Sequence, residues 1–334
     1  MSLARRTEVE VTWLGVAITD EIAPFLTGVT VADPMSGAVN DLSLDLQDRD
    51  GKWSGDWRPH LGDAAEVRIK AEAWLTGVDS INFGTFAHDS ASFSGPPNKV
   101  SIKCVSASLA TGLRRHRKNR KWTSAPLEQM AQDIADAAGL DLYYNAPAVN
   151  HGRREQKDQS DLDFLSQECT EAGFALKVGD GKIVIFEERA REQLPPVGTI
   201  SLSGGHVLGW SFEDSSTDHY GRCRVSCTKA RTGKKIEGTF RDPGDEGPTL
   251  EVKRAVSTQA EAEAIAKGLL RSANRGGSKG QLTVIGDPGF FGGAVFDLTD
   301  ARSFDGRYIV TKATHNVTGG YTCTLDVRRV LEGY

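Results

Sequence analysis

The chain has 334 residues, of which 39% are hydrophobic and 25% charged, and its formal net charge is -5. This length predicts two domains or three small ones, and the composition excludes an intrinsically disordered chain. No apolar stretch approaches the roughly 18 residues of a membrane-spanning helix, and the N-terminal residues lack the apolar core of a secretion signal. We therefore expect no membrane span and a cytoplasmic origin. The mild negative charge argues against non-specific nucleic-acid binding by the whole surface.

The cysteines are scattered and number five, which argues against a disulfide framework. Cys223 and Cys227 flank Val225 at the two-residue spacing of a half-buried strand, so reduced thiols explain them without zinc. The seven histidines show no metalloprotease-like spacing. We expect neither a metal nor a cofactor.

Residues 1–112 alternate between apolar and polar side chains with the period of a β-strand. Leu42, Leu44 and Leu46, for example, alternate with Ser43 and Asp45. Short turn-rich segments separate such runs, as in hairpins that join neighbouring strands. This region is predicted to form a first antiparallel β-barrel-like domain.

Residues 113–190 have the pattern of a small α+β domain. Ser124 is placed to cap a helix that ends at Gly139, and Ser160 begins a second helix that ends at Gly173. A predicted hairpin over residues 174–186 follows.

Strand patterns return in residues 191–334 and end in a pair of strands over residues 308–317 and 321–327. One helix interrupts them, with Thr258 and Glu261 as its capping box. The predicted fold class is mainly β with an α+β insertion, in which this region is a second barrel-like domain with one inserted helix.

Residues that resemble catalytic motifs lie among elements that do not suit a catalytic site. Ser278 lies between spaced glycines as in the nucleophile elbow of esterases, but a helix precedes it and a strand follows, which reverses the required order. Among the acidic residues of the second helix, Asp161 and Asp163 favour its N-terminus, whereas Glu168 and Glu171 fit a solvated face. We expect no catalytic residues.

A strongly basic run separates the first β region from the α+β region. Six of its residues are cationic: Arg114, Arg115, Arg117, Lys118, Arg120 and Lys121. This run is a candidate contact with an acidic partner, and the alternative is a solvated linker. Stacking aromatic residues are not interleaved with it, so specific nucleic-acid binding is not expected.

Four ordered segments resemble the phage late control protein D family, whose members are baseplate hub proteins of contractile phage tails and tail-like bacteriocins, related to the hub part of VgrG-type spikes. The segments are Asp48-Arg-Asp-Gly-Lys-Trp53 with Trp57, Pro59 and Gly62-Asp63; Ser94-Gly-Pro-Pro97 before Val100-Ser-Ile102; Gln159-Ser-Asp161-Leu-Asp-Phe164-Leu165 with Gly173; and Asp305-Gly306-Arg-Tyr308-Ile-Val310 with His315 and Tyr321.

The resemblance implies two barrels of similar fold in one chain and a homotrimeric ring between the tail tube and the central spike. The implied partners are the chain itself, the spike protein, the tube or tube-initiator protein, other baseplate proteins and the tape measure protein. The implied location is the bacterial cytoplasm during assembly and then the baseplate. Two other readings remain open, a cell-wall or glycan-binding tail module and a tail-associated cell-wall hydrolase.

Overall fold

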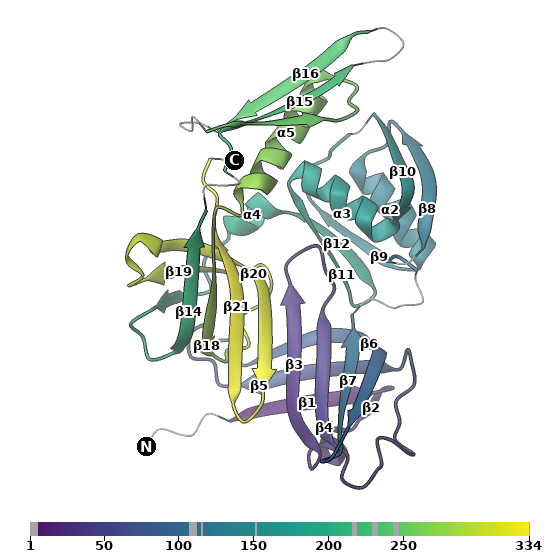
Figure 1. Ribbon diagram of the computed structural model, residues 1–334, viewed down its shortest axis with the longest axis vertical. Coiled ribbons are helices and arrows are strands. Elements are labelled where there is room, and N and C mark those ends of the chain that lie inside the picture. Colours follow the sequence, from purple (N-terminus) through teal and green to yellow (C-terminus); the bar gives the residue numbers. More distant parts are fainter. Residues whose placement is uncertain are drawn as a thin grey trace.

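The computed structural model describes residues 6–106, 112–114, 116–150, 152–215, 219–228, 233–242 and 247–333. Strands dominate it, as predicted. They form one 13-stranded sheet and three small sheets, against which the longer helices pack (Figure 1).

The N-terminal part of the large sheet is antiparallel throughout. The long strand β6 pairs with β5 through its first half and with β7 through its second, and its register shifts between His88 and Ser90. A short helix, α1 (Thr19–Ile22), follows the first hairpin. The strands are β1 (Thr7–Trp13), β2 (Val16–Ala17), β3 (Leu26–Pro34), β4 (Asp41–Gln47), β5 (Ala64–Ala71), β6 (Ser80–Ser94) and β7 (Lys99–Val105).

The C-terminal part of the same sheet is also antiparallel, except that β13 runs parallel to β19. A 3-10 turn, Arg302–Phe304, lies before β20. The strands are β13 (Thr199–Ser201), β14 (Val207–Asp214), β18 (Ser278–Ile285), β19 (Val295–Thr299), β20 (Gly306–Val317) and β21 (Tyr321–Arg329).

Strand β20 joins the two parts. It pairs with β19 near its start and with β3 further along, in a register that runs from Lys312 opposite Pro34 to Val317 opposite Val29. The strand order then runs openly from β14 to β2, so the described residues form no closed barrel. The prediction of two separate barrels is therefore wrong for these residues. Because β20 pairs with β3 of the N-terminal region, the strands of both regions continue into one open sheet.

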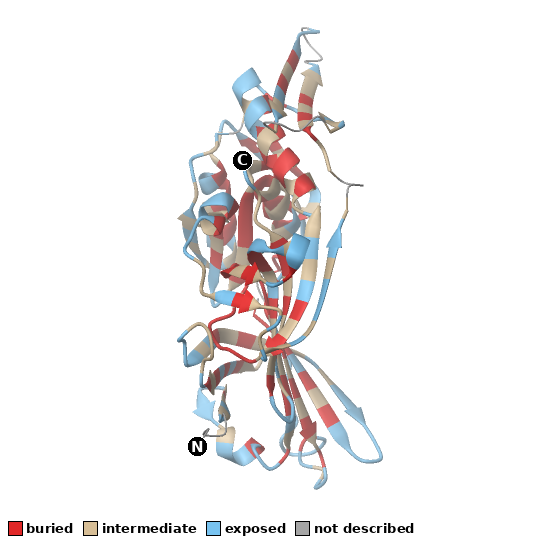
Figure 2. Cartoon of the chain, turned by 90° about the vertical axis from the view of Figure 1, so that its left-hand side faces the viewer, coloured by how far each residue is buried: buried red, intermediate tan, exposed pale blue. Residues whose placement is uncertain are grey.

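Both ends of the chain also share one apolar core. Val29, Leu44 and Ile102 from the N-terminal region belong to the same buried cluster as Leu325 and Tyr308 from the C-terminal region. Buried and exposed residues alternate along these strands, as the two-residue period predicts (Figure 2).

The predicted α+β unit has its own core and consists of a mixed sheet, a two-stranded sheet and helices. Gly139 and Gly173 end two of the helices in the left-handed conformation, as predicted. Ser160 caps the second helix, but Pro126 rather than Ser124 occupies the N-cap of the first. The elements are β8 (Arg117–Thr123), α2 (Leu127–Ala138), β9 (Asp141–Asn145), β10 (Arg153–Ser160), α3 (Asp161–Ala172), β11 (Phe174–Gly179), β12 (Lys182–Glu187) and α4 (Glu188–Glu192).

A third core lies between α5 (Gln259–Asn274) and a small sheet of β15 (Arg222–Thr228), β16 (Lys235–Arg241) and β17 (Thr249–Lys253). Thr258 caps this helix as predicted. The helix covers the small sheet rather than the large one, because Gly238 lets β16 approach it closely. A Cβ atom at Gly238 would lie 2.4 Å from the backbone nitrogen of Glu263.

Candidate interaction surface

Most of the basic run is a strand rather than a linker or a projecting junction. Arg117 to Lys121 lie in β8, which pairs with β10, while Arg114 precedes the strand and is exposed. Arg115 lies outside the described residues. Because side chains alternate along a strand, β8 divides the run into inward and outward groups.

Two of the predicted contact residues point inward, to Asp161. Lys118 Nζ lies 2.6 Å from Asp161 Oδ2, and Arg120 Nη1 lies 3.5 Å from Oδ1. Gln156 Nε2 also donates to Asp161 Oδ1, at 2.9 Å. Asp161 is buried at the start of α3, so Lys118 and Arg120 compensate an internal charge. Both charges are thus already paired within the α+β unit, which the sequence did not indicate.

The outward face of β8 and β10 keeps a positive character. Arg117 pairs with the exposed Asp158 at 3.2 Å, and hydrogen bonds from Lys157 and Arg153 lower the pKa of Glu155. Acidic residues therefore offset part of the positive charge, although cations outnumber acids on this face. Its exposed cations are Arg117, Lys121, Arg153 and Lys157.

Trp122, which ends the basic run, belongs to the core of the α+β unit. Its ring stacks on Phe164 with centroids 4.9 Å apart, and its Nε1 donates to Asp133 Oδ2 at 2.9 Å. The residue is buried and is therefore no platform for a base.

Glu168 and Glu171 of α3 form a buried ion-pair cluster and not a solvated face. Glu168 accepts from Arg154 Nε at 2.9 Å and from Arg254 Nη2 at 2.8 Å. Glu171 accepts from Arg254 Nε at 2.9 Å. Burial raises the pKa of Glu168, and the two guanidinium groups act in the opposite direction. The sequence did not indicate this burial because Arg254 lies 86 residues from Glu168, in the segment before α5, and because the fold of β10 against α3 brings in Arg154.

Ser278 is the first residue of β18 and lies opposite Asp214 of β14. Helix α5 precedes it, which confirms the order of elements that excluded a nucleophile elbow. The residue itself is part of the strand.

His315 of β20 is buried against β21 and the segment before β19. Its Nε2 lies 3.0 Å from the carbonyl oxygen of Phe290, and its Nδ1 lies 2.7 Å from the hydroxyl of Tyr321. A carbonyl can only accept, so Nε2 carries the proton and Nδ1 accepts from Tyr321. Burial lowers the pKa of His315 to about 4, which keeps the ring neutral. The contacts join backbone segments and give the histidine a structural role.

The five thiols are free, and burial raises the pKa of Cys104 and of Cys323 to about 12. Within the described ranges, no group of three or more histidine, cysteine, aspartate or glutamate residues is placed to hold a metal. His151 lies outside those ranges. No helix in the described part of the chain is long and apolar enough to cross a membrane.

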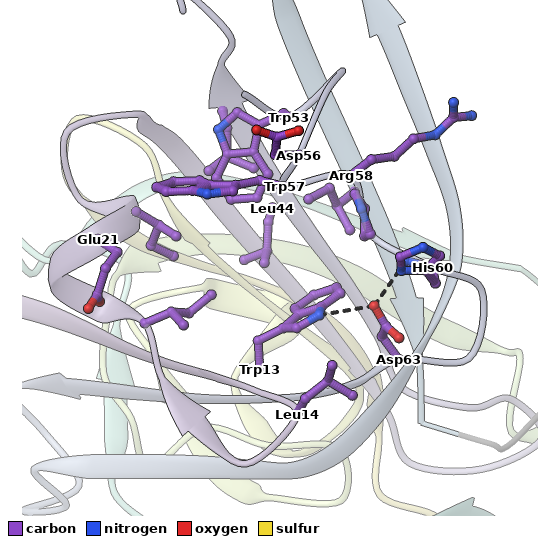
Figure 3. A pocket seen from close by; sticks show the side chains of 15 residues that line it. Trp13, Leu14, Glu21, Leu44, Trp53, Asp56, Trp57, Arg58, His60 and Asp63 are labelled. Atoms are coloured by element: carbon purple, nitrogen blue, oxygen red, sulfur yellow. Dashed lines mark hydrogen bonds between the residues drawn. The ribbon is translucent and has the colours of Figure 1, made fainter. Parts of the chain in front are cut away.

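A pocket of about 360 Å³ opens beside β1 and the loop that follows β4 (Figure 3). Trp13, Trp53 and Trp57 line it together with aliphatic residues of β4 and β7. Trp13 Nε1 donates to Asp63 Oδ2 at 3.2 Å, which fixes one wall. Sequence reasoning missed this pocket because its walls come from separate segments, although two of the tryptophans lie in the first resembling segment.

The sequence matches no known family model, and no curated protein is detectably similar. Solved structures share the fold at low identity. The 43 kDa tail protein of prophage MuSo2 from Shewanella oneidensis is 14% identical, with a TM-score of 0.72 over 97% of this chain and 98% of that chain.

A tail protein from Neisseria meningitidis MC58 is also 14% identical, with a TM-score of 0.74 over 97% of this chain and 96% of that chain. The c3393 protein of E. coli, a type VI secretion component described as similar to the T4 tail proteins gp27 and gp5, is 10% identical. Its TM-score is 0.58 over 100% of this chain and 76% of that chain. The chain therefore has the fold of phage tail proteins and of related secretion-system components, along almost its whole length.

Proposed function

We propose that this chain is a structural baseplate hub of a contractile tail, which joins the tail tube to the central spike. The observation that carries the proposal is the extent of the shared fold. Tail proteins match the chain from end to end, including the α+β unit and the β15–β17 unit, with comparable length on both sides.

The proposed assembly is a homotrimeric ring. Each chain supplies an N-terminal and a C-terminal β region, for which we keep the boundaries 1–112 and 191–334 as a proposal, with 113–190 between them. Three chains would present six β regions around one axis, and this number suits a threefold spike on one side and a sixfold tube on the other. Rings of this kind form through heterologous contacts between identical chains.

The proposed role is not enzymatic. Two of the acidic residues that the sequence offered as a possible carboxylate pair, Glu168 and Glu171, are engaged with Arg254 in the interior. Such pairing holds elements together, and it does not leave these two carboxyl groups free to donate or accept a proton at a substrate.

We propose that the outward cations of β8 and β10 meet an acidic surface of another tail protein. The exposed side chains of Arg117 and Lys121 lie on the same face as Arg153 and Lys157. Rim charges of this kind steer association and set its salt dependence more than they set final affinity.

The proposal is tested by deleting the gene in cells that produce the whole tail. Without the chain, tube and spike proteins should accumulate as separate species, and supply of the chain in trans should restore joined particles. Particles that join tube and spike without it would contradict the proposal, as would release of cell-wall fragments by the purified chain.

A further inference from the structure

We propose that the pocket lined by Trp13, Trp53 and Trp57 receives the side chain of Trp210 from a neighbouring copy of this chain. The inference rests on the proposed ring, for which it supplies a specific contact between adjacent copies.

The pocket is an apolar recess with a polar mouth. Leu44, Leu46 and Ile102 line its depth, and the rings of Trp53 and Trp57 meet edge to face with centroids 5.5 Å apart. Figure 3 shows two exposed acidic residues beside the pocket: Glu21, whose carboxylate points away from the other lining side chains, and Asp56, which lies near Trp53. Leu14 lies on the rim and is 61% exposed. Such a recess suits an apolar group that carries a hydrogen-bond donor at its tip.

Trp210 has an apolar ring with one hydrogen-bond donor, and it lies on β14, at the end of the strand order. It lies opposite the buried Leu282 in the pairing of β14 with β18, so the two side chains are on the same, core-facing side of the sheet. Further along β14, Phe212 stacks on Phe304 with centroids 5.2 Å apart. Because β14 is the last strand of the sheet, the core ends at this margin and Trp210 remains 56% exposed.

Size and hydrogen bonding favour this occupant. A pocket of about 360 Å³ is at the small end of ligand sites, which are roughly 300–1,000 Å³, and suits a single bicyclic ring. The indole Nε1 is a donor only, and the exposed carboxylate of Asp56, which lines the pocket, is an acceptor. A sugar would need several converging polar groups. The pocket is also lined by Arg58, His60 and Asp63, but Asp63 Oδ2 already accepts from Trp13 Nε1 and from the backbone amide of His60, and the buried lining residues are aliphatic and aromatic.

The positions of the two parts make the contact heterologous. Trp210 lies on β14, at one end of the strand order, whereas the pocket is formed by β4, β7 and the hairpin of β1 and β2, and β14 does not line it. A chain that offers Trp210 to one neighbour therefore keeps its pocket open for the next. Contacts of this type close into rings when the rotation between copies divides a full turn.

The direct test is photo-cross-linking in cells that produce the whole tail. Benzoylphenylalanine at position 210 keeps an aromatic side chain there, and the same residue at position 143 is a matched control, because Tyr143 is 58% exposed on β9 of a different unit. We expect irradiation of the position-210 variant to join two copies through a peptide that contains Trp13 or Trp53 and Trp57. Cross-links to other regions, or none, would overturn the inference.

Two variants test the same contact by mixing. Trp210→Ala removes the inserted side chain and Leu14→Asp places a charge on the rim, and both positions are exposed enough for the chain to fold. Each variant alone should assemble into rings about tenfold less well or worse, as is typical of a central tryptophan, whereas Tyr143→Ala should not. In an equimolar mixture, Trp210 of the Leu14→Asp chain can still enter the intact pocket of the Trp210→Ala chain. The reverse contact is lost, so the mixture should stop at 1:1 dimers.

The outcomes distinguish this contact from the proposed function. If the wild-type chain and Trp210→Ala both form trimers equally well, the contact is wrong and the hub proposal stands. If the wild-type chain remains a single copy in assembled tails, the hub proposal itself fails. If the wild-type chain binds saccharides, Leu14→Asp does not, and position 210 forms no cross-link to the pocket, the inference is overturned and the pocket is a glycan site.

Discussion

Arg328 of β21 donates from Nη2 to Glu188 Oε2 of α4 over 3.1 Å, and both side chains are buried. The other oxygen of Glu188 accepts from Arg275, just beyond the end of α5, at 2.7 Å. Glu192, one turn further along α4, lies 2.6 Å from Arg271 of α5. The short helix α4 thus connects the large sheet to the β15–β17 unit, and buried charges set how these parts are placed.

Removal of Arg328 should be costly. Arg328→Leu leaves buried carboxylates with fewer partners, and the loss of one member of a buried pair costs about 3–5 kcal/mol. The matched control is Arg307→Leu, because Arg307 Nε also pairs with a carboxylate, Asp297 Oδ1, at 3.0 Å, but the two side chains are 42% and 36% exposed. That exposed pair should contribute at most about 1 kcal/mol. Urea denaturation of both variants measures the difference, and equal losses would contradict the role given to burial.

Gly268 is required where α5 crosses α3. A Cβ atom there would lie 2.1 Å from the carbonyl oxygen of Glu171, so the two helices would have to separate. Gly268→Ala should lower the free energy of unfolding by about 1–3 kcal/mol, although alanine is favoured over glycine within a helix by about 1 kcal/mol. Gly209→Ala is the control, since nothing lies within 4 Å of a Cβ at that position. A Gly268→Ala variant as stable as the wild type would show that the helices are not held this closely.

His315 should make stability depend on pH. The unfolded chain takes up this proton near pH 6.5, whereas the folded chain resists it until about pH 4, because burial lowers the pKa. The unfolded state therefore binds more protons between these values. The contribution of the neutral His315 ring to the free energy of unfolding is fully present above pH 6.5. It is lost as the pH falls toward 4, by roughly 3 kcal/mol in total.

The measurement is the urea midpoint of the wild type and of His315→Gln at pH 7 and pH 4.5. The variant lacks the titrating ring, so its midpoint should fall less between the two conditions, even if it is less stable at pH 7. A fall as steep as that of the wild type would assign the acid sensitivity to other groups.

The outward cations should affect assembly, and the inward ones should affect folding. Arg117→Glu with Lys121→Glu should leave the monomer folded but impair assembly, most clearly at low salt, where charges are least screened. Lys118→Glu should instead destabilise the chain, because it places a second carboxylate beside the buried Asp161. Thermal unfolding and particle yield, measured on both variants, separate the two effects. Normal particle yield and salt tolerance in the Arg117→Glu, Lys121→Glu variant would show that the outward face of β8 and β10 binds no partner during assembly.

Most features that depend on neighbours in sequence were predicted well, although the cap predicted at Ser124 is at Pro126. Ser160 and Thr258 accept hydrogen bonds from residues three positions ahead, and Gly139 and Gly173 end their helices by local backbone geometry. These interactions require no knowledge of the rest of the chain, so patterns of side chains suffice to find them.

Features that depend on distant pairing were not predicted. The alternation within β20 shows which face is buried but not that its edge meets β3, so the sequence indicated two barrels where one open sheet is found. Likewise, Lys118 and Asp161 are 43 residues apart in sequence, and only the pairing of β8 with β10 brings them together. Contact of the basic run with a partner stays a prediction. Arg117 and Lys121 are exposed, whereas Lys118 and Arg120 face Asp161, which the sequence did not indicate.

The central proposal concerns copy number. Native mass measurement of the chain in complex with its spike protein counts the copies directly, whether or not the free chain is a monomer. The proposed hub predicts three copies of the 36.1 kDa chain for each trimeric spike. One copy or six copies in that complex would contradict it.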